Sequence, residues 1–265
     1  MRFLISQRRH RAARPIILAV ALLLMGALYA SLSPTRVAAD GTNAEKVAAG
    51  KNLFAQNCAS CHGLNGEGGS QAPTLIGVGA AAVDFQVGTG RMPMAQPGAQ
   101  ALRKPPVLDP DEIAALAAYV ESLGPGQPIP AQSQYSPEGL TEHEIARGGE
   151  LFRTNCSACH NFGGGGGALP NGKFAPPLHG VEARHIWEAL RTGPQQMPVF
   201  SAGAIPDNDV RAIIAYLKDL EKTPSAGFTL GGLGPVTEGL AAWIFGIVTL
   251  VLFALWIAAK GARAR

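Results

Sequence analysis

The pentapeptide Cys-x-x-Cys-His occurs twice in this chain of 265 residues, and the two copies contain all four of its cysteines. In c-type cytochromes this spacing allows two thiols to add across the vinyl groups of one haem, while the adjoining histidine becomes the proximal ligand of the iron. We therefore expect two covalently bound haems c. The attachment residues are Cys58, Cys61 and His62 for the first haem, and Cys156, Cys159 and His160 for the second.

The Cys-x-x-Cys part of the motif also occurs in zinc sites and in thiol–disulfide oxidoreductases. A structural zinc site needs two further ligands, and neither motif has a second Cys-x-x-Cys near it. A dithiol enzyme needs neither a histidine directly after the second cysteine nor a Met-Pro dipeptide downstream. The motifs therefore favour haem attachment and indicate an electron carrier.

The sequence around the two motifs is duplicated. Residues 48–58 align with residues 146–156 without a gap, and Ala-Pro-x-Leu-x-Gly strings and Met-Pro dipeptides recur downstream of both. Each copy closes on a segment with apolar residues at helical spacing. We expect two helical domains, at 41–124 and 140–222. Between them, 125–139 is predicted to be a semi-rigid linker, with too many prolines for a helix or a central strand.

Three local signals concern structure rather than chemistry. Asp109 is placed to cap the closing helix of the first copy, with Pro110 at the first helical position and Glu112 completing a capping box. Asp207 is expected to play a similar part in the second copy. The glycine run Gly163–Gly167 is interpreted as a flexible loop that is a tolerated surface insertion.

An iron that only transfers electrons needs a second protein ligand. Apart from Met1 and Met25 near the N-terminus, every methionine lies between a haem motif and a closing helix. A thioether is a soft, weak donor that raises the reduction potential. Met197 is the candidate for the second iron. For the first iron Met92 and Met94 compete, and the shared Met-Pro dipeptide favours Met92.

Other residues near the motifs have weaker assignments. His179 and His185 are less favoured ligands of the second iron, because the first copy has no histidine beyond its motif. A carbonyl near Pro73 or Pro176 is a candidate acceptor for the other ring nitrogen of the proximal histidine, with a simple turn as the alternative. Three arginines are either partners of haem propionates or solvated surface residues: Arg91, Arg103 and Arg191.

The C-terminal region predicts a membrane helix. Residues 240–259 carry no charge, and at 1.5 Å per residue a helix of this length spans roughly 30 Å, the thickness of the hydrocarbon core of a bilayer. Trp243 and Trp256 lie near its two ends, and 260–265 is a basic tail. We expect a transmembrane helix after a linker at 223–239, with a buried helix of a soluble protein as the alternative.

The N-terminal residues 1–39 contain an arginine-rich start, the apolar stretch Ile16–Ala30 and the small-residue string Val37–Ala39. A cleaved signal peptide and an uncleaved anchor remain equal alternatives. In either case the chain is exported. The positive-inside rule places the C-terminus in the cytoplasm and the haem domains outside the cell membrane. All acidic residues lie between the basic ends, so the exported part is mildly acidic, which argues against nucleic acid as a partner.

Each unit resembles a class I cytochrome c domain, with an N-terminal helix, the Cys-x-x-Cys-His motif, a Pro-x-Leu loop, a Met-Pro loop and a closing helix. Taken whole, and with the string Gly-Pro-Gln-Gln-Met-Pro-Val-Phe at 193–200, the chain resembles the dihaem cytochrome c subunits of actinobacterial cytochrome bc1 complexes. This resemblance implies a mainly α fold: two tandem class I cytochrome c domains, a C-terminal transmembrane helix and an N-terminal signal or anchor helix.

The resemblance also implies a role in a menaquinol:cytochrome c reductase that forms a supercomplex with a terminal oxidase. One haem would receive an electron from the Rieske iron–sulfur protein and the other would pass it on, while quinol oxidation would belong to other subunits, including cytochrome b. It implies the ligand set Cys58, Cys61, His62 and Met92 for one haem and Cys156, Cys159, His160 and Met197 for the other.

Two alternative functions remain at this point. The first is a dihaem cytochrome subunit of another membrane complex such as a haem–copper oxidase, in which the anchor precedes the haem domains rather than following them. The second is a dihaem peroxidase, whose working haem must leave one position open for peroxide. The two Met-Pro dipeptides argue against an open position.

Overall fold

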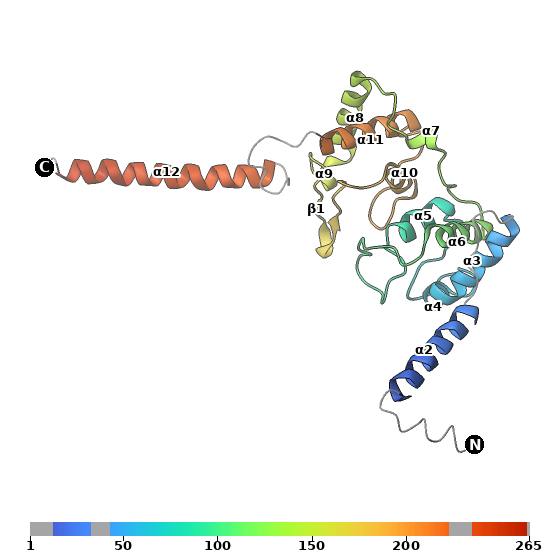
Figure 1. The fold of residues 1–265 in the computed structure, drawn as a ribbon. Helices are drawn as coiled ribbons and strands as arrows, with labels where there is room; N and C mark the ends of the chain where they lie inside the picture. The colour runs from blue at the N-terminus through green and yellow to red at the C-terminus, as the bar shows by residue number, and fades with distance from the viewer. Residues whose placement is uncertain (1–12, 33–42, 223–234, 264–265) are drawn as a thin grey trace, which may run out of the picture. The chain divides into compact units, whose positions relative to one another are not determined.

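The computed structural model describes residues 13–32, 43–222 and 235–263. Across these ranges the chain is mainly helical, as the sequence predicts. It divides into two units, residues 1–41 and residues 42–265. The first unit contains helix α2 (Ala13–Leu32). The second contains both duplicated segments and the C-terminal helix, whose elements Figure 1 labels in chain order.

The first duplicated segment folds around two long helices that pack against each other, one from each end of the segment. Its closing helix begins as predicted. The Asp109 carboxylate accepts hydrogen bonds from the backbone N–H groups of Asp111 and Glu112, and the Glu112 carboxylate accepts one from the Asp109 N–H at 2.9 Å. The capping box is therefore confirmed. The helices are α3 (Asn43–Asn57), α4 (Ala59–His62), α5 (Ala80–Gly88) and α6 (Pro110–Ser122).

The second duplicated segment repeats this order of helices and adds a small antiparallel strand pair. Its first and last long helices pack against each other as in the first segment. The elements are α8 (Glu142–Asn155), α9 (Ser157–His160), β1 (Gly167–Ala168), the 3-10 turn η1 (Pro170–Gly172), β2 (Phe174–Ala175), α10 (Ala183–Thr192) and α11 (Asp207–Lys222).

A glycine allows each pair of long helices to cross closely. A Cβ added at Gly50 of α3 would lie 2.0 Å from the carbonyl oxygen of Ala115 on α6. In the second segment a Cβ at Gly148 would lie 2.0 Å from the carbonyl oxygen of Ala212. Because glycine has no Cβ, the two backbones can come into contact. The two glycines occupy matching positions of the duplicated sequence, so both domains depend on the same close crossing.

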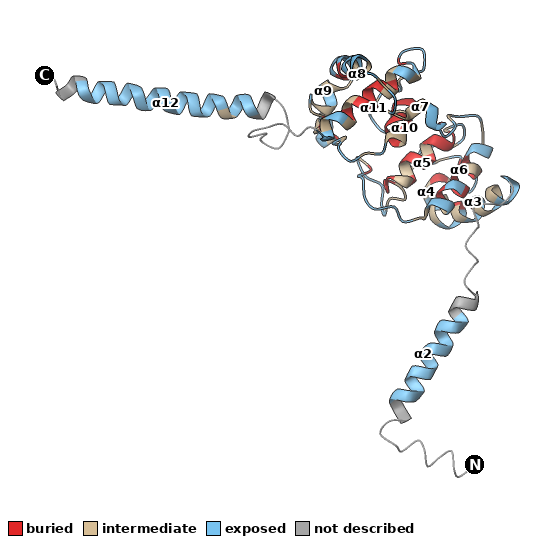
Figure 2. Cartoon of the chain, turned by 45° about the horizontal axis from the view of Figure 1, so that its top comes forward, coloured by how far each residue is buried: buried red, intermediate tan, exposed pale blue. Residues whose placement is uncertain are grey.

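An aromatic pair stabilises each crossing. The ring centroids of Phe54 and Tyr119 lie 5.2 Å apart in the first domain, and those of Phe152 and Tyr216 lie 5.8 Å apart in the second. Both pairs are tilted, within the range of distances at which aromatic rings attract one another. Figure 2 shows that the buried residues of the two domains concentrate on helices such as α5, α6, α10 and α11.

The glycine run Gly163–Gly167 is not a flexible insertion, and that prediction was wrong. The N–H of Gly166 donates to the carbonyl of His160 at 3.0 Å. Its φ is +84°, and an added Cβ would lie 2.5 Å from the carbonyl oxygen of Ala175. In the first domain Gly68 makes the same bond to its own motif histidine at 2.7 Å, with φ +79°. The glycines therefore fold the chain back beneath both motifs.

The linker at 125–139 differs from the prediction in one respect. It contains a single helical turn, α7 (Gln132–Tyr135), in a stretch that is free of proline. The Gln134 amide donates to the carboxylate of Asp207 at 2.9 Å, and Tyr135 packs against the core of the second domain. The second half of this segment is therefore part of the second domain's packing.

Asp207 does not cap the last helix of the second domain, and that prediction was also wrong. It is the first helical residue, because the order here is Pro206 then Asp207, whereas the first domain has aspartate before proline. The Asp207 carboxylate instead accepts from the Trp187 indole N–H at 3.0 Å and from the Arg191 guanidinium at 2.6 Å. Asp207 therefore holds α10 and α11 together.

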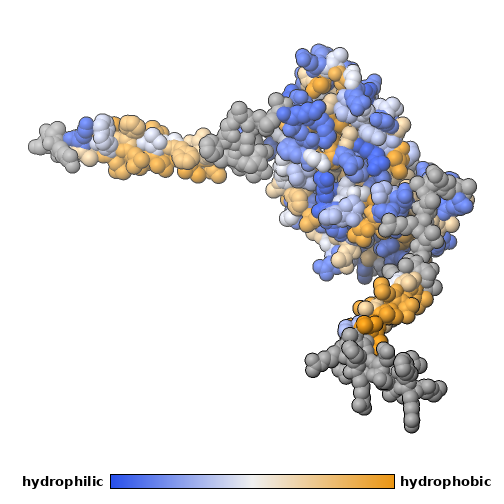
Figure 3. Space-filling view, viewed as in Figure 1, coloured by the Kyte–Doolittle hydropathy of each residue, from blue (hydrophilic) through white to orange (hydrophobic). Residues whose placement is uncertain are grey.

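The C-terminal helix α12 runs over Pro235–Arg263 and is apolar, as Figure 3 shows by its colour. Its segment Glu238–Lys260 has 23 residues and contains an 18-residue window with a mean hydropathy of 2.5, so it is long and apolar enough to cross a membrane. None of the apolar window is buried, so the structure does not support the alternative of a core helix. The ammonium of Lys260 lies 4.2 Å above the ring of Trp256, an arrangement suited to a membrane interface.

Helix α2 contains the shorter apolar stretch Pro15–Leu28. The N-terminal arginines up to Arg11 and the string Val37–Ala39 lie outside the described residues. A signal peptide and an anchor therefore both remain predictions for this segment.

The glycine crossings generate a stability prediction. Gly50→Ala should lower the free energy of unfolding by about 1–3 kcal/mol, because the new methyl group must push α3 away from α6. Gly69→Ala is the matched control, since an added Cβ there meets no atom within 4 Å. Urea unfolding followed by circular dichroism measures both. Equal stability of the two variants would contradict a crossing that requires glycine.

Candidate haem-binding sites

Each Cys-x-x-Cys-His motif forms a tight helical turn directly after a long helix. In the first domain the N–H of Cys58 donates to the carbonyl of Phe54 at 2.8 Å, and the N–H of His62 donates to the carbonyl of Cys58 at 3.0 Å. The second motif repeats these bonds, at 2.8 Å from Cys156 to Phe152 and at 2.9 Å from His160 to Cys156. The same local fold therefore presents both motifs.

The proximal histidines are fixed by proline carbonyls, as predicted. The Nδ1 of His62 lies 2.9 Å from the carbonyl oxygen of Pro73, and the Nδ1 of His160 lies 3.0 Å from that of Pro176. Because a carbonyl oxygen only accepts, each Nδ1 must carry the proton, which leaves Nε2 with its lone pair free for a metal. Burial lowers the pKa of His160, and the bond to Pro176 acts in the opposite direction. The net effect keeps this imidazole neutral, the form that binds iron.

The first cysteine of each motif is not activated as a reactive thiol would be in an enzyme. Burial raises the pKa of Cys58 and of Cys156 to about 11, and the second cysteine of each motif adds to the rise. Thiolates are the nucleophiles and the metal ligands, and reactive cysteines have lowered pKa values. This environment argues against the dithiol enzyme and the zinc site, and it is compatible with thiols that are consumed by covalent attachment.

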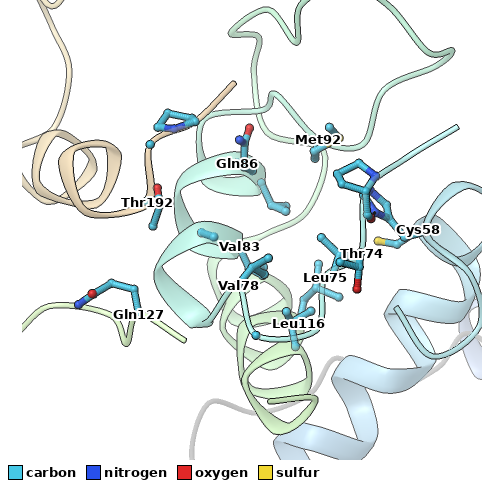
Figure 4. Close-up of a pocket in the computed structure, with 18 of the residues that line it drawn as sticks. Cys58, Thr74, Leu75, Val78, Val83, Gln86, Met92, Leu116, Gln127 and Thr192 are labelled. Atoms are coloured by element: carbon cyan, nitrogen blue, oxygen red, sulfur yellow. Dashed lines mark hydrogen bonds between the residues drawn. The ribbon is translucent and has the colours of Figure 1, made fainter. Parts of the chain in front are cut away.

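The first domain contains a cavity of about 580 Å³ beside its motif. Its volume lies within the range of roughly 300–1,000 Å³ that is usual for cofactor pockets. Cys58, His62 and Met92 line it together, and its wall is mostly apolar. Figure 4 shows Cys58 and Met92 around the same space as Val83 of α5. The residues present therefore fit a haem, with a histidine and a thioether available to one iron.

Met94 is placed differently from Met92. Its methyl group lies near Gly98, where an added Cβ would come within 3.3 Å of it. Met94 is absent from the lining of the first cavity. Met92 instead packs against the core of the first domain together with Cys58. The geometry favours Met92 as the residue that faces the cofactor.

The second domain places its candidates in the same way. Met197 and Cys156 both pack against the core of the second domain. His179 is held elsewhere, with its Nε2 2.6 Å from the carbonyl oxygen of Gly163. His185 faces α5 of the first domain, where its ring meets Phe85 edge-on with centroids 6.2 Å apart. Neither histidine competes with Met197 in this arrangement.

The second domain forms part of the wall of the first cavity, which the sequence reasoning did not anticipate. Residues 191–195 line the cavity, and Figure 4 shows Thr192 on the side of the cavity away from Cys58. Met197 follows only two residues after this segment. No local signal in the sequence indicates this contact, because most of the extra spacing before the second Met-Pro dipeptide lies upstream, between His160 and Ala175.

Two glutamines clamp the domains together. The side chain of Gln195 both donates to and accepts from the backbone of Ala101, at 3.1 Å in each case. The side chain of Gln100 binds the backbone of Phe174 in the same two-bond manner, at 2.6 and 3.1 Å. Side-chain amides paired with backbone in this way fix both distance and orientation. These paired hydrogen bonds therefore join the two domains directly.

The arginines are less solvated than the surface interpretation implies. Arg91 is buried, donates to the hydroxyl of Thr89 at 2.6 Å and stacks over the ring of Phe85. Arg191 is buried against Asp207 and lines the first cavity. Arg103 is exposed and donates to a backbone carbonyl of the second domain at 3.3 Å. A propionate role for these residues stays a prediction.

Comparison with protein families supports the two-domain interpretation. Residues 47–124 match the cytochrome c model, and residues 143–217 match the model of cytochrome c oxidase, cbb3-type, subunit III. Both duplicated segments are therefore cytochrome c domains. Such domains carry covalently bound haem c, which agrees with the geometry of the motifs.

Relatives extend the likeness to nearly the whole chain. The cytochrome bc1 complex cytochrome c subunit of Mycobacterium tuberculosis is 45% identical over 258 residues, which are 95% of this chain and 92% of the relative. The protein of the same name from Corynebacterium diphtheriae is 42% identical over 267 residues and 95% of each chain. The chain belongs to the family of cytochrome bc1 complex cytochrome c subunits. The function of this family is electron transfer, as the sequence predicts.

A more distant relative represents one of the alternative functions. The cbb3-type cytochrome c oxidase subunit FixP of Bradyrhizobium diazoefficiens is 27% identical over 186 residues, covering 65% of this chain and 60% of that protein. The cytochrome bc1 subunits are more similar to this chain than FixP is, both in sequence identity and in the share of the chain that is covered. Membership of the bc1 family therefore takes precedence over the oxidase alternative.

Proposed function

We propose that this chain relays electrons through two covalently bound haems c within a quinol:cytochrome c reductase. The observation that carries the proposal is the duplication of the candidate ligand set and of its supporting contacts. In each domain a motif histidine is fixed through Nδ1 by a proline carbonyl, and a methionine of a Met-Pro dipeptide packs against the same core as the motif's first cysteine. A chain with a single functional haem would not require the histidine, the proline carbonyl and the methionine to be kept in both copies.

The proposed ligands follow from these contacts. Cys58 and Cys61 attach the first haem, and His62 and Met92 bind its iron. The second haem has the corresponding residues Cys156, Cys159, His160 and Met197. Haem c supplies reversible one-electron chemistry. The chain would supply a histidine and a methionine to each iron, would orient the imidazole through its proline carbonyl, and would surround the site with apolar residues that exclude water.

The contact between the domains supports a relay from one site to the other. The segment 191–195 forms part of the first cavity wall and leads within two residues to Met197. A short run of backbone thus joins the environment of one haem to a ligand of the other. The glutamine clamps on Ala101 and Phe174 hold this connection in place.

The membrane role of the chain follows from α12. We propose that Glu238–Lys260 anchors the protein, with the basic C-terminal tail in the cytoplasm and the haem domains on the extracytoplasmic side. The proposed electron donor is the Rieske iron–sulfur protein, and the proposed acceptor is a terminal oxidase in a supercomplex. Oxidation of menaquinol would take place in other subunits, including cytochrome b.

One observation favours a second candidate function. Residues 143–217 match the subunit III model of a cbb3-type oxidase. Under this alternative the chain would be the cytochrome subunit of a haem–copper oxidase and would receive its electrons from a separate carrier. The two functions differ in the proteins that bind the chain directly.

The proposed iron ligands generate a prediction about the reduction potentials of the haems. Met92→His should keep the covalent haem and lower the potential of one haem, because imidazole favours ferric iron more than a thioether does. Met94→Leu is the matched control and should leave both potentials unchanged. Redox titration of the haem absorption bands measures these values. A shift with Met94→Leu but not with Met92→His would transfer the role to Met94.

The second prediction concerns the complex. Affinity purification of the full chain in a mild detergent should recover a cytochrome b and a Rieske protein, and the recovered complex should reduce its haems c when quinol is added. Recovery of haem–copper oxidase subunits without cytochrome b would favour the second candidate. Recovery of the chain alone would count against both proposed assemblies.

A further inference from the structure

A cluster of buried polar side chains lies between the two cytochrome domains, away from both motifs. Asp84 comes from α5 of the first domain, and His185 and Glu188 come from α10 of the second. One ligand atom from each residue can be chosen so that all three atoms lie within 4.8 Å of one another. The cluster is nearly dry, since the exposed fractions are 6%, 7% and 0% in that order.

These side chains lack the hydrogen bonds that burial normally demands. Among the described residues, neither carboxylate oxygen of Glu188 has a hydrogen-bond partner while both carboxyl groups are ionised, and the Nε2 of His185 has none. A proton on Glu188 would give it one hydrogen bond to Asp84, which still leaves one oxygen of Glu188 and the Nε2 of His185 without a partner. The Oδ2 of Asp84 lies 3.1 Å from the Nε of Arg184, without the alignment of a hydrogen bond. Buried polar groups without partners are rare, because each costs about 1–3 kcal/mol. Several polar atoms without partners in one buried cluster indicate that a ligand binds there.

The geometry suits a metal cation. The Nε2 of His185 lies 3.9 Å from an oxygen of Asp84 and 3.9 Å from an oxygen of Glu188. Ligands at about 2.0–2.2 Å from a tetrahedral zinc ion lie roughly 3.3–3.6 Å apart, so a small inward movement completes the site. His185 and Glu188 are three residues apart on one helix and therefore share a face. The same spacing provides metal ligands in helical bundles.

The neighbouring residue Gly88 leaves room beside the imidazole. An added Cβ at Gly88 would come within 3.2 Å of the Nε2 of His185. In the other direction the ring of His185 rests against Phe85, which fixes its plane. The unpartnered nitrogen therefore faces a space that a larger residue at position 88 would reduce.

We propose that Asp84, His185 and Glu188 bind a divalent transition-metal cation, Zn²⁺, that joins the two cytochrome domains. An imidazole and two carboxylates form a ligand set that zinc accepts, and a fourth position remains for water. None of the three residues lines the cavity of the first domain, and the proposal does not rest on the proposed redox partners. Its effect would be to fix the packing of α5 on α10, and with it the placement of one haem domain on the other.

The charges around the cluster set its proton chemistry. Burial raises the pKa of Glu188 to about 10, and the adjacent Asp84 adds to the rise. Burial lowers the pKa of His185, which favours the neutral imidazole, the form in which one ring nitrogen can bind a metal. Arg184, Glu182 and Arg103 also act on this imidazole, the arginines against protonation and the carboxylates of Asp84 and Glu182 in favour of it.

Titration of Zn²⁺ into the haem-loaded full chain in mild detergent, after removal of metals with a chelator, tests the proposal. Calorimetry should find one tight equivalent of Zn²⁺ per chain. Glu188→Gln and His185→Gln should each weaken binding at least about tenfold, since removal of even an outer-shell partner of a metal site costs that much. His143→Gln is the matched control, an exposed histidine of α8, and should bind as the unmodified chain does.

A third variant covers the case in which a ligand substitution disturbs folding. Gly88→Ala keeps all three ligands but places a methyl group beside His185, and it should weaken binding of Zn²⁺ while the haem spectrum and helix content stay unchanged. X-ray absorption at the zinc edge should report one imidazole and oxygen ligands. No saturable binding by the unmodified chain, or tight binding that survives both Glu188→Gln and His185→Gln, would overturn the proposal.

Discussion

The candidate haem site of each domain depends on the hydrogen bond between the motif histidine and a proline carbonyl. It assigns the proton of the imidazole to Nδ1 and leaves Nε2 for iron, at 2.9 Å in the first domain and 3.0 Å in the second. The loop that presents the carbonyl must turn sharply beneath the motif, and Gly68 and Gly166 make that turn at positive φ. The motif is in turn held by the long helix before it, which crosses the closing helix at Gly50 or Gly148. The two copies therefore share the residues that support the motif histidine as well as the residues that are expected to bind haem.

Features that depend on local sequence could be predicted. The attachment motifs, the two-domain order, the capping box at Asp109 and the apolar C-terminal helix each follow from residues close together in the chain. The failures came where a distant part of the chain decides the outcome. Gly166 looked like a filler residue because the local pattern shows neither its hydrogen bond to the carbonyl of His160 nor its close approach to the carbonyl of Ala175. Asp207 looked like a cap because the local pattern does not show its partners on α10. Likewise, nothing near Gln134 indicates that it contacts α11.

The interface between the domains could not be predicted from the sequence. Its contacts join residues about 75 to 105 positions apart, among them the glutamine clamps and the cluster of Asp84, His185 and Glu188. These contacts are polar and directional, so they fix one arrangement where a purely apolar contact would tolerate several. For a chain that carries electrons between two sites, a single arrangement is useful because the distance between cofactors then stays constant. The segment that closes the first cavity and continues to Met197 has the same consequence.

The account depends most on one covalently attached haem c in each domain. Intact-mass measurement of the native polypeptide, combined with peptide mapping of the attachment sites, tests this directly. The mass should exceed that of the polypeptide by two haems, with one haem on the peptide of Cys58 and Cys61 and one on the peptide of Cys156 and Cys159. A polypeptide that carries no haem, or a single haem with the other pair of thiols free, would contradict the account.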